Sequence, residues 1–228
     1  MGFYQQLQEQ TRSERARLMQ TALVRTATHG PISLDSYVAF LTQAYHHVKH
    51  TLPLLMAAGA RMDERHGWLR AAIAEYIAEE TGHEEWILND IAACGAEAEA
   101  VRHGVPAIET ELMVSYAYDT IARINPVGFF GMVQVLEGTS VTAATTAARN
   151  IQRGLNLPDK AFSYLLSHGD LDQDHIQFFE SLMDKIDDPA EQALVVHCAK
   201  VFYRLYGDIF RSLPISGLDG KRIEEIPA

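Results

Sequence analysis

Four separate stretches of the sequence place a histidine or a carboxylate where the helical hydrophobic pattern calls for an apolar residue. Burying such groups without partners is energetically expensive, so a set of them indicates that they bind something together. Carboxylates mixed with imidazoles suit a transition metal such as iron or manganese. The candidate metal ligands are His47, Glu80, His83, Glu137, His168, Asp172 and His175.

The spacing of two pairs among these candidates is typical of dinuclear metal sites in helical bundles. Such bundles project a glutamate from some helices and a Glu-x-x-His pair from others. Glu80 and His83 have this spacing, and Asp172 and His175 repeat it with an aspartate. His168 lies one turn before Asp172, so these last three donors share one helix face. The pattern predicts a site for two metal ions.

The element that must position Glu80 and His83 is predicted to be one long helix from Leu69 to Cys94. This stretch contains no proline, and its only glycine, Gly82, lies among strong helix formers. Apolar residues recur at steps of three and four, and the stripe they form continues through both donors. The apolar residues of the stripe are Leu69, Ile73, Tyr76, Ile77, Ile87 and Ile91.

The other donors lie on further predicted helices. A helix over Leu34–Ala60, capped by Ser33 and bent at Pro53, has an apolar stripe whose next position is His47. A helix starting at Asn125-Pro126 and ending near Gly154 places Glu137 on its apolar face, next to small residues. The remaining predicted elements are a helix over Tyr4–Thr26, an acidic connection over Ala96–Gly104, a helix over Ala107–Ile124, a short helix ending at Ser167, a helix over His168–Ile186 with Gly169 as a candidate break, and a helix over Pro189–Leu213.

Each candidate also has a simpler structural interpretation. A single histidine on an apolar helix face is often a hydrogen-bonded core residue, and Glu137 alone could belong to a buried ion pair. That interpretation must be invoked separately on four helices, with few basic residues on those faces to neutralise the carboxylates, so the sequence favours a metal site. Surface or ordinary packing roles are expected for the remaining histidines, which are His29, His46, His50, His66, His103 and His197.

Composition limits the class of protein. The chain has 228 residues, 47% of them hydrophobic, which fits one all-α domain over residues 1–213 followed by a loose tail over residues 214–228. A net charge of −11 without a basic cluster disfavours nucleic acid as a partner. The N-terminal residues have no apolar signal region, and no apolar run is long enough to span a membrane, so we expect a cytoplasmic protein. Cys94 and Cys198 are expected to be reduced, buried thiols.

Three short motifs give the chain a resemblance to a known family. They are E-E-T-G-H-E-E-W over Glu79–Trp86, L-E-G-T-S over Leu136–Ser140, and S-H-G-D-L-D-Q-D-H over Ser167–His175. With them the chain resembles the heme-oxygenase-like, or TenA/PqqC-like, superfamily of seven-helix proteins. It is most similar to the branch of heme-oxygenase-like diiron oxidases and related iron-containing redox enzymes, over about Leu7–Leu213.

The resemblance implies a function and a cofactor. It implies that the candidate residues bind two non-heme Fe(II) ions, with manganese or a single metal as alternatives. His47 stands where diiron members carry a glutamate. O2 is the implied cosubstrate, and the small-molecule substrate is amine- or amino-acid-like, oxidised by N-oxygenation, desaturation or oxidative C–C cleavage. A homodimer is implied, and Tyr76, Phe130 and Phe179 are expected to form the apolar wall of the site.

Other branches of the superfamily match less well. A heme oxygenase needs a proximal histidine on its first helix, whereas the first histidine here is His29. TenA thiaminases use a cysteine nucleophile, and neither Cys94 nor Cys198 lies in a matching motif. The alternative function is a TenA/PqqC-like small-molecule binding protein, or a thiamine-related enzyme, without a dinuclear metal.

Overall fold

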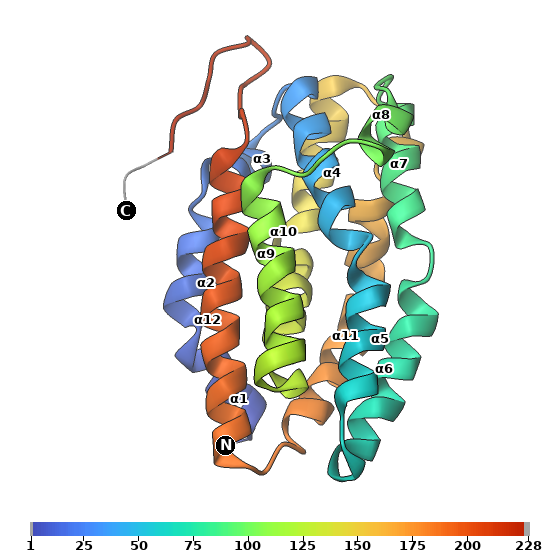
Figure 1. Ribbon diagram of the computed structural model, residues 1–228. Coiled ribbons are helices and arrows are strands. Elements are labelled where there is room, and N and C mark those ends of the chain that lie inside the picture. Colours follow the sequence, from blue (N-terminus) through green and yellow to red (C-terminus); the bar gives the residue numbers. More distant parts are fainter. Residues whose placement is uncertain (1, 226–228) are drawn as a thin grey trace.

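The computed structural model describes residues 2–225, except for the side chains of residues 139–142 and 167–175. Long helices run along the length of one bundle, and α9 crosses in front of α10 in the view of Figure 1. The α-helices of the described residues are α1 Phe3–Gln10, α2 Arg12–Met19, α3 Ala22–His29, α4 Leu34–Val48, α5 Thr51–Arg61, α6 Gly67–Glu80, α7 His83–Ala93, α8 Ala98–Arg102, α9 Ile108–Asp119, α10 Phe130–Leu155, α11 Ser163–Met183 and α12 Pro189–Ser212.

The all-α prediction is confirmed. Helix α10, with 26 residues, packs against α3, α11 and α12, while α4 packs on α7 and α5 on α6. Buried apolar side chains from these helices form one hydrophobic core. Short 3-10 turns over Glu64–His66, Pro126–Phe129 and Asp159–Ala161, and a π turn over Thr120–Ile124, join the longer elements. The core therefore surrounds α10, the helix that carries Glu137.

The long helix predicted over Leu69–Cys94 is wrong at its centre. Helix α6 ends at Glu80 and α7 begins at His83, because Gly82 has a left-handed backbone with φ of +94°. This conformation is strained for residues with a Cβ atom and is readily adopted by glycine. Thr81 adds a competing bond, since its Oγ1 donates to the Ile77 carbonyl at 2.6 Å. Glu80 and His83 consequently sit on two helix ends that meet.

Two other predicted helices are also interrupted. The helix predicted over Tyr4–Thr26 is divided into α1, α2 and α3, with Thr11 and Thr21 at the two breaks. The hydroxyl of each threonine donates to a carbonyl of the preceding turn, which competes with regular helical hydrogen bonding. The helix predicted over Leu34–Ala60 breaks at Lys49 and His50, and Pro53 lies in the first turn of α5, where its missing N–H is tolerated.

The later helices correspond more closely to the prediction. Ser33 caps α4 as expected, accepting from the backbone N–H of Ser36 at 3.2 Å. Gly169 does not break a helix, because the backbone of α11 is helical from Ser163 to Met183. The acidic connection after Cys94 contains the short helix α8. Both cysteines are buried free thiols, as predicted.

The tail after Pro214 contacts the bundle at two places, first at Ile215 and Ser216 and again at Glu224 and Glu225. Ile215 is buried, and Ser216 pairs with Arg222 in an isolated antiparallel bridge. The backbone N–H of Ser33 donates to the Ser216 carbonyl at 2.8 Å, which ties the tail to the start of α4. The expectation of a loose tail is therefore wrong at Ile215 and Ser216, whereas residues 218–222 are exposed.

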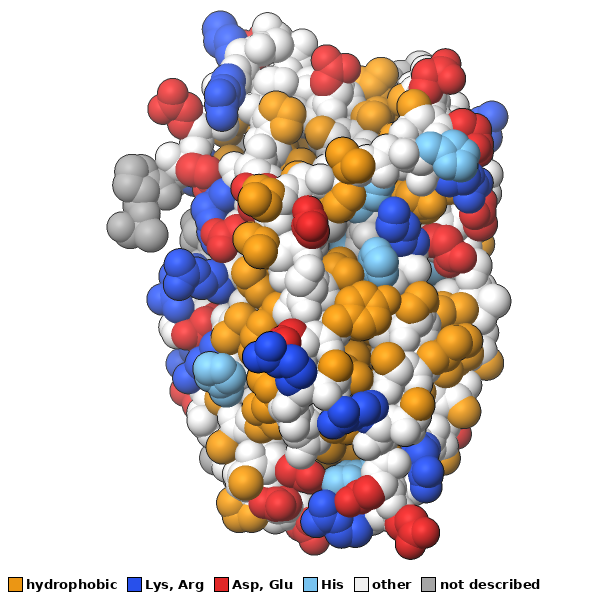
Figure 2. Space-filling model, in the orientation of Figure 1, with side chains coloured by type: hydrophobic (Ala, Val, Ile, Leu, Met, Phe, Trp, Pro, Cys, Tyr) orange, Lys and Arg blue, Asp and Glu red, His pale blue; other side chains and the backbone are white. Residues whose placement is uncertain are grey.

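The face of the molecule shown in Figure 2 carries side chains of both charges. On the face seen in Figure 2, lysine and arginine side chains are scattered among acidic ones, and hydrophobic side chains gather across the middle. Within the described residues, every helix is too short or too polar to cross a membrane.

One histidine expected to have an ordinary role instead links distant elements. The His66 Nδ1 atom lies 2.8 Å from Asp63 Oδ1, and its Nε2 atom lies 3.0 Å from Oε2 of Glu191 at the start of α12. Asn125 donates to the other Glu191 oxygen at 3.3 Å. Because ionised carboxylates only accept hydrogen bonds, both ring nitrogens must carry protons to satisfy this arrangement.

We expect this cluster to make stability depend on pH. Burial alone would lower the pKa of His66, but the bonds to Glu191 and Asp63 outweigh it and raise the pKa above its ordinary value. The stabilisation is complete below the unfolded-state pKa of about 6.5 and is lost as the pH rises through the raised folded-state value. A His66→Gln variant should therefore lose more stability relative to wild type at about pH 6 than at about pH 9 in denaturant titrations. An equal loss of stability at both pH values would contradict a charged His66. The control is His103→Gln, which changes a histidine with an exposed side chain.

Candidate metal centre

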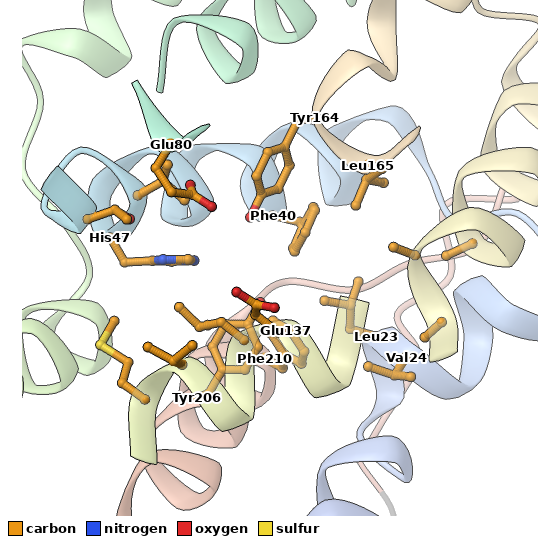
Figure 3. Close-up of a pocket in the computed structure, with 18 of the residues that line it drawn as sticks. Leu23, Val24, Phe40, His47, Glu80, Glu137, Tyr164, Leu165, Tyr206 and Phe210 are labelled. Atoms are coloured by element: carbon orange, nitrogen blue, oxygen red, sulfur yellow. The ribbon is translucent and has the colours of Figure 1, made fainter. Parts of the chain in front are cut away.

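The bundle contains a partly open cavity of about 170 Å³ whose wall is largely apolar. Since one water needs about 10–15 Å³ by this measure, the cavity has room for on the order of ten waters, or for a small organic molecule. Its polar groups are few, and Figure 3 shows His47, Glu80 and Glu137 directed into it from different helices. Three of the seven predicted ligands are thus brought to one cavity.

His47 reaches the cavity from the last turn of α4. Its side chain is 2% exposed, and its ring meets the Tyr206 ring edge-on at a centroid distance of 5.7 Å. The predicted apolar stripe of α4 explains its position, because Tyr37, Leu41 and Ala44 on the same face are all buried. The sequence pattern therefore located His47 correctly on the buried face.

Glu80 and His83 are adjacent even though the predicted continuous helix is interrupted between them. His83 Nδ1 lies 2.9 Å from Glu80 Oε2, and the His83 ring packs on Trp86 at a centroid distance of 4.1 Å. Glu80 lines the cavity, whereas His83 is buried behind it and does not line it. This contact fixes the position of the Glu80 carboxylate relative to the His83 ring.

Glu137 is positioned by the close packing of α10 on α12. A Cβ atom on Gly131 would lie 2.6 Å from the backbone nitrogen of Ala199, so only glycine permits this approach. Glu137 lies nearly two turns further along α10 and enters the cavity from the side opposite Glu80 in Figure 3. Two carboxylates and an imidazole thus converge from α4, α6 and α10.

The remaining predicted ligands, His168, Asp172 and His175, lie outside the described side chains. Their backbone belongs to α11, which packs against α7 and α10, the helices of His83 and Glu137. Among the side chains that are described, no three histidine, cysteine, aspartate or glutamate residues gather closely enough to hold a metal ion by themselves. The seven-ligand set therefore stays a prediction. In donor chemistry, the oxygen and nitrogen ligands at the cavity fit iron or manganese.

Asp90 is a site-supporting residue that the sequence analysis missed. Its side chain is fully buried on α7, where Oδ1 accepts from the Ser163 backbone N–H at 3.0 Å and Oδ2 from the Tyr164 N–H at 2.9 Å. The Ser163 hydroxyl also donates to Oδ1. Burial raises the pKa of Asp90, and these bonds offset part of that effect. The carboxylate thus caps α11, which has no side-chain cap of its own. A polar residue between the buried Leu88 and Ile91 was the available signal.

Tyrosines supply most of the other polar atoms around the cavity. Tyr76, Tyr164 and Tyr206 all line it, and burial raises the pKa of each. The predicted wall is therefore correct for Tyr76. It is wrong for Phe130 and Phe179, which are buried in the core and do not line the cavity. The neighbouring Phe129 lines the cavity instead.

The histidines expected to have packing or surface roles do not line the cavity. His46 is buried, and its Nδ1 lies 3.2 Å from the Nζ atom of Lys49. Burial, and to a lesser degree the positive charge of Lys49, lowers the pKa of His46 to about 4. His50 contacts the Tyr118 hydroxyl at 3.1 Å. His29 is exposed at the end of α3, with Nδ1 2.8 Å from the Arg25 carbonyl.

Comparison with solved structures defines the class of fold. A domain of unknown function with a heme oxygenase-like fold from Shewanella denitrificans superposes with a TM-score of 0.82 at 22% identity, covering 92% of this chain and 90% of that one. A TenA homologue from Pseudomonas syringae superposes with a TM-score of 0.76 at 14% identity, covering 91% of this chain and 90% of the homologue. A heme oxygenase from Leptospira interrogans superposes with a TM-score of 0.72 at 18% identity, covering 93% of this chain and 100% of the heme oxygenase. The chain has the heme-oxygenase-like fold.

The sequence itself identifies the family. The model of a family described as iron-containing redox enzymes matches residues 38–207, which is most of the chain. The protein belongs to this iron-containing redox enzyme family. The matched region includes all seven predicted ligands and extends from within α4 to within α12. No curated protein matches the sequence.

Proposed function

We propose that this protein is a non-heme diiron oxidase that uses O2 to oxidise a small amine- or amino-acid-like metabolite. The observation that carries the proposal is the convergence of His47, Glu80 and Glu137 on one largely apolar cavity. Membership of the iron-containing redox enzyme family supports iron as the metal. The oxidation would be an N-oxygenation, a desaturation or an oxidative C–C cleavage.

The iron ligands would come from both the described and the predicted parts of the site. Glu80, Glu137 and His47 would bind iron at the cavity, with His83 supporting Glu80 or binding through Nε2. The set of ligands would be completed by the three donors on α11, which are His168, Asp172 and His175. When bound, the iron would supply the electrons and coordination positions that O2 activation needs.

The chain's own residues would bind the substrate and exclude water. Among the described residues that line the cavity, two are carboxylates and none is lysine or arginine. An amine is therefore a better electrostatic match to the wall than an anionic group. The apolar side chains around these donors would keep bulk water from the reacting groups, which strengthens the electrostatic interactions inside the cavity.

A binding protein without turnover is the second candidate. It is favoured by the cavity wall, which is largely apolar and leaves room for a small organic molecule. Such a protein would use the same cavity to hold a small molecule without a dinuclear metal. The two functions differ in what they do with iron and oxygen.

Oxygen consumption separates these candidates. Protein loaded anaerobically with Fe(II) should show an optical change on exposure to O2 and should consume O2 beyond the rate of the same Fe(II) in buffer. Protein unfolded and then given the same iron is the control. Consumption no faster than that of free iron would contradict an oxidase and leave the binding function.

A further inference from the structure

The cavity is elongated along α10, and its two ends differ chemically. Lining residues on α10 run from Met132 to Ile151, which corresponds to about 28 Å of helix at 1.5 Å per residue. Figure 3 shows the polar donors towards one side of the cavity and Leu23 and Val24 of α3 on the other. The metal site thus occupies only part of the available length.

The end away from the donors is formed by α3 and α10 and is apolar. Its apolar lining residues, which we call the α3–α10 end, are Leu23, Val24, Ala27, Ala144, Ala147 and Ile151. Thr28 of α3 also lines the cavity, and its hydroxyl donates to the Val24 carbonyl at 2.7 Å, so it already has a hydrogen-bond acceptor within its own helix. Three of the six apolar residues are alanines, whose short side chains leave space between two helices that pack directly on each other. A polar substrate the size of a free amino acid would have nothing to bind there.

One buried hydroxyl group near the donors makes no hydrogen bond within the described part of the chain. The Tyr76 side chain is 3% exposed and lines the cavity, and its buried hydroxyl makes no hydrogen bond to a described residue. Leaving a buried hydroxyl unsatisfied is unfavourable, so such a group inside a cavity is suited to a ligand. Tyr76 and Glu80 lie one turn apart on α6, which places this hydroxyl at the donor side.

We propose that the substrate is an alkylamine with a linear hydrocarbon tail, which lies in the α3–α10 end while its amine hydrogen-bonds with the Tyr76 hydroxyl. The assignment of an amine head group rests on the proposed oxidase function, whereas the assignment of a hydrocarbon tail follows from the shape and lining of the cavity. This narrows the substrate from amine- or amino-acid-like molecules to amines with an apolar tail. The α-carboxylate of an amino acid would find no cationic side chain on the described wall.

Calorimetric titration of metal-free protein with n-butylamine, n-hexylamine and n-octylamine tests the tail. Burying a methylene group stabilises by an amount that corresponds to about a four-fold gain in affinity, so affinity should rise steeply along the series. Ala147→Leu, which fills the α3–α10 end, should weaken n-octylamine binding by about ten-fold or more and leave n-butylamine unchanged. Ala93→Leu, at a similarly half-buried position outside the cavity, should bind like wild type.

The Tyr76→Phe variant tests the head group. It should weaken all three amines by the same factor, about five-fold for one hydrogen bond, without changing the dependence on chain length. The ligand-free variant should be no less stable than wild type, since it loses an unsatisfied hydroxyl. Affinity that does not rise with chain length, or a rise that Ala147→Leu retains, would overturn the proposal. These binding results do not depend on iron loading, so a wild-type protein that failed to consume O2 would refute the oxidase but leave the tail assignment standing.

Discussion

Replacing Asp90 with alanine is expected to lower the free energy of unfolding by about 3 kcal/mol, one of the largest effects of any single change outside the donors. The variant loses a carboxylate that accepts hydrogen bonds from the backbone N–H groups of Ser163 and Tyr164. These two N–H groups begin α11 and would lose their acceptor. Leaving them without a partner costs more free energy than the hydrogen bonds contribute on balance. Urea denaturation measures the loss.

The effect should also reach the metal site. Because α11 carries His168, Asp172 and His175, loosening its first turn should weaken Fe(II) binding as well as stability. Asn89→Ala, an exposed neighbour on α7, is the matched control and should change stability by less than about 0.5 kcal/mol. A stable Asp90→Ala protein with intact α11 would show that Asp90 does not hold this helix.

The second large effect is expected from Glu80→Gln, which should reduce Fe(II) affinity by about 100-fold or more. Glutamine preserves the size of the side chain and can still accept a hydrogen bond from His83, whose Nδ1 lies 2.9 Å from Glu80. It removes the negative charge that an iron ligand needs. Metal-free Glu80→Gln should be at least as stable as wild type, because Glu80 and Glu137 are like charges in one apolar cavity.

The control for this change is Glu75→Gln, an exposed carboxylate on the same helix α6. It should leave iron affinity unchanged. If the metal-free Glu80→Gln protein were markedly destabilised while iron binding stayed the same, Glu80 would be a structural partner of His83 and not a ligand.

Hydrophobic periodicity predicted the buried faces well. The stripe that ends at His47, and the one that includes Leu69, Ile73 and Ile91, are buried as expected, because side-chain burial follows the helical repeat directly. The all-α fold followed from the same pattern. The convergence of His47, Glu80 and Glu137 on one cavity could also be anticipated, since each occupies an apolar position on its helix.

Helix interruptions and contacts between helices could not be predicted in this way. The break at Gly82 depends on a left-handed backbone, which a glycine permits but does not require. The roles of Asp90 and His66 depend on residues 73 and 125 positions away, Ser163 and Glu191, which no local pattern connects. The anchoring of the tail has the same cause, because Ser216 accepts a hydrogen bond from Ser33, 183 residues earlier in the chain.

Anaerobic titration of the wild-type protein with Fe(II) tests the central claim most directly. If donors from α4, α6, α7, α10 and α11 converge as proposed, binding should approach two ions per chain, and His47→Ala should weaken one of the two sites more than the other. The bound iron should also raise the unfolding midpoint, since it binds only the folded state. Binding of no iron above background, with no change in the unfolding midpoint, would contradict a diiron centre.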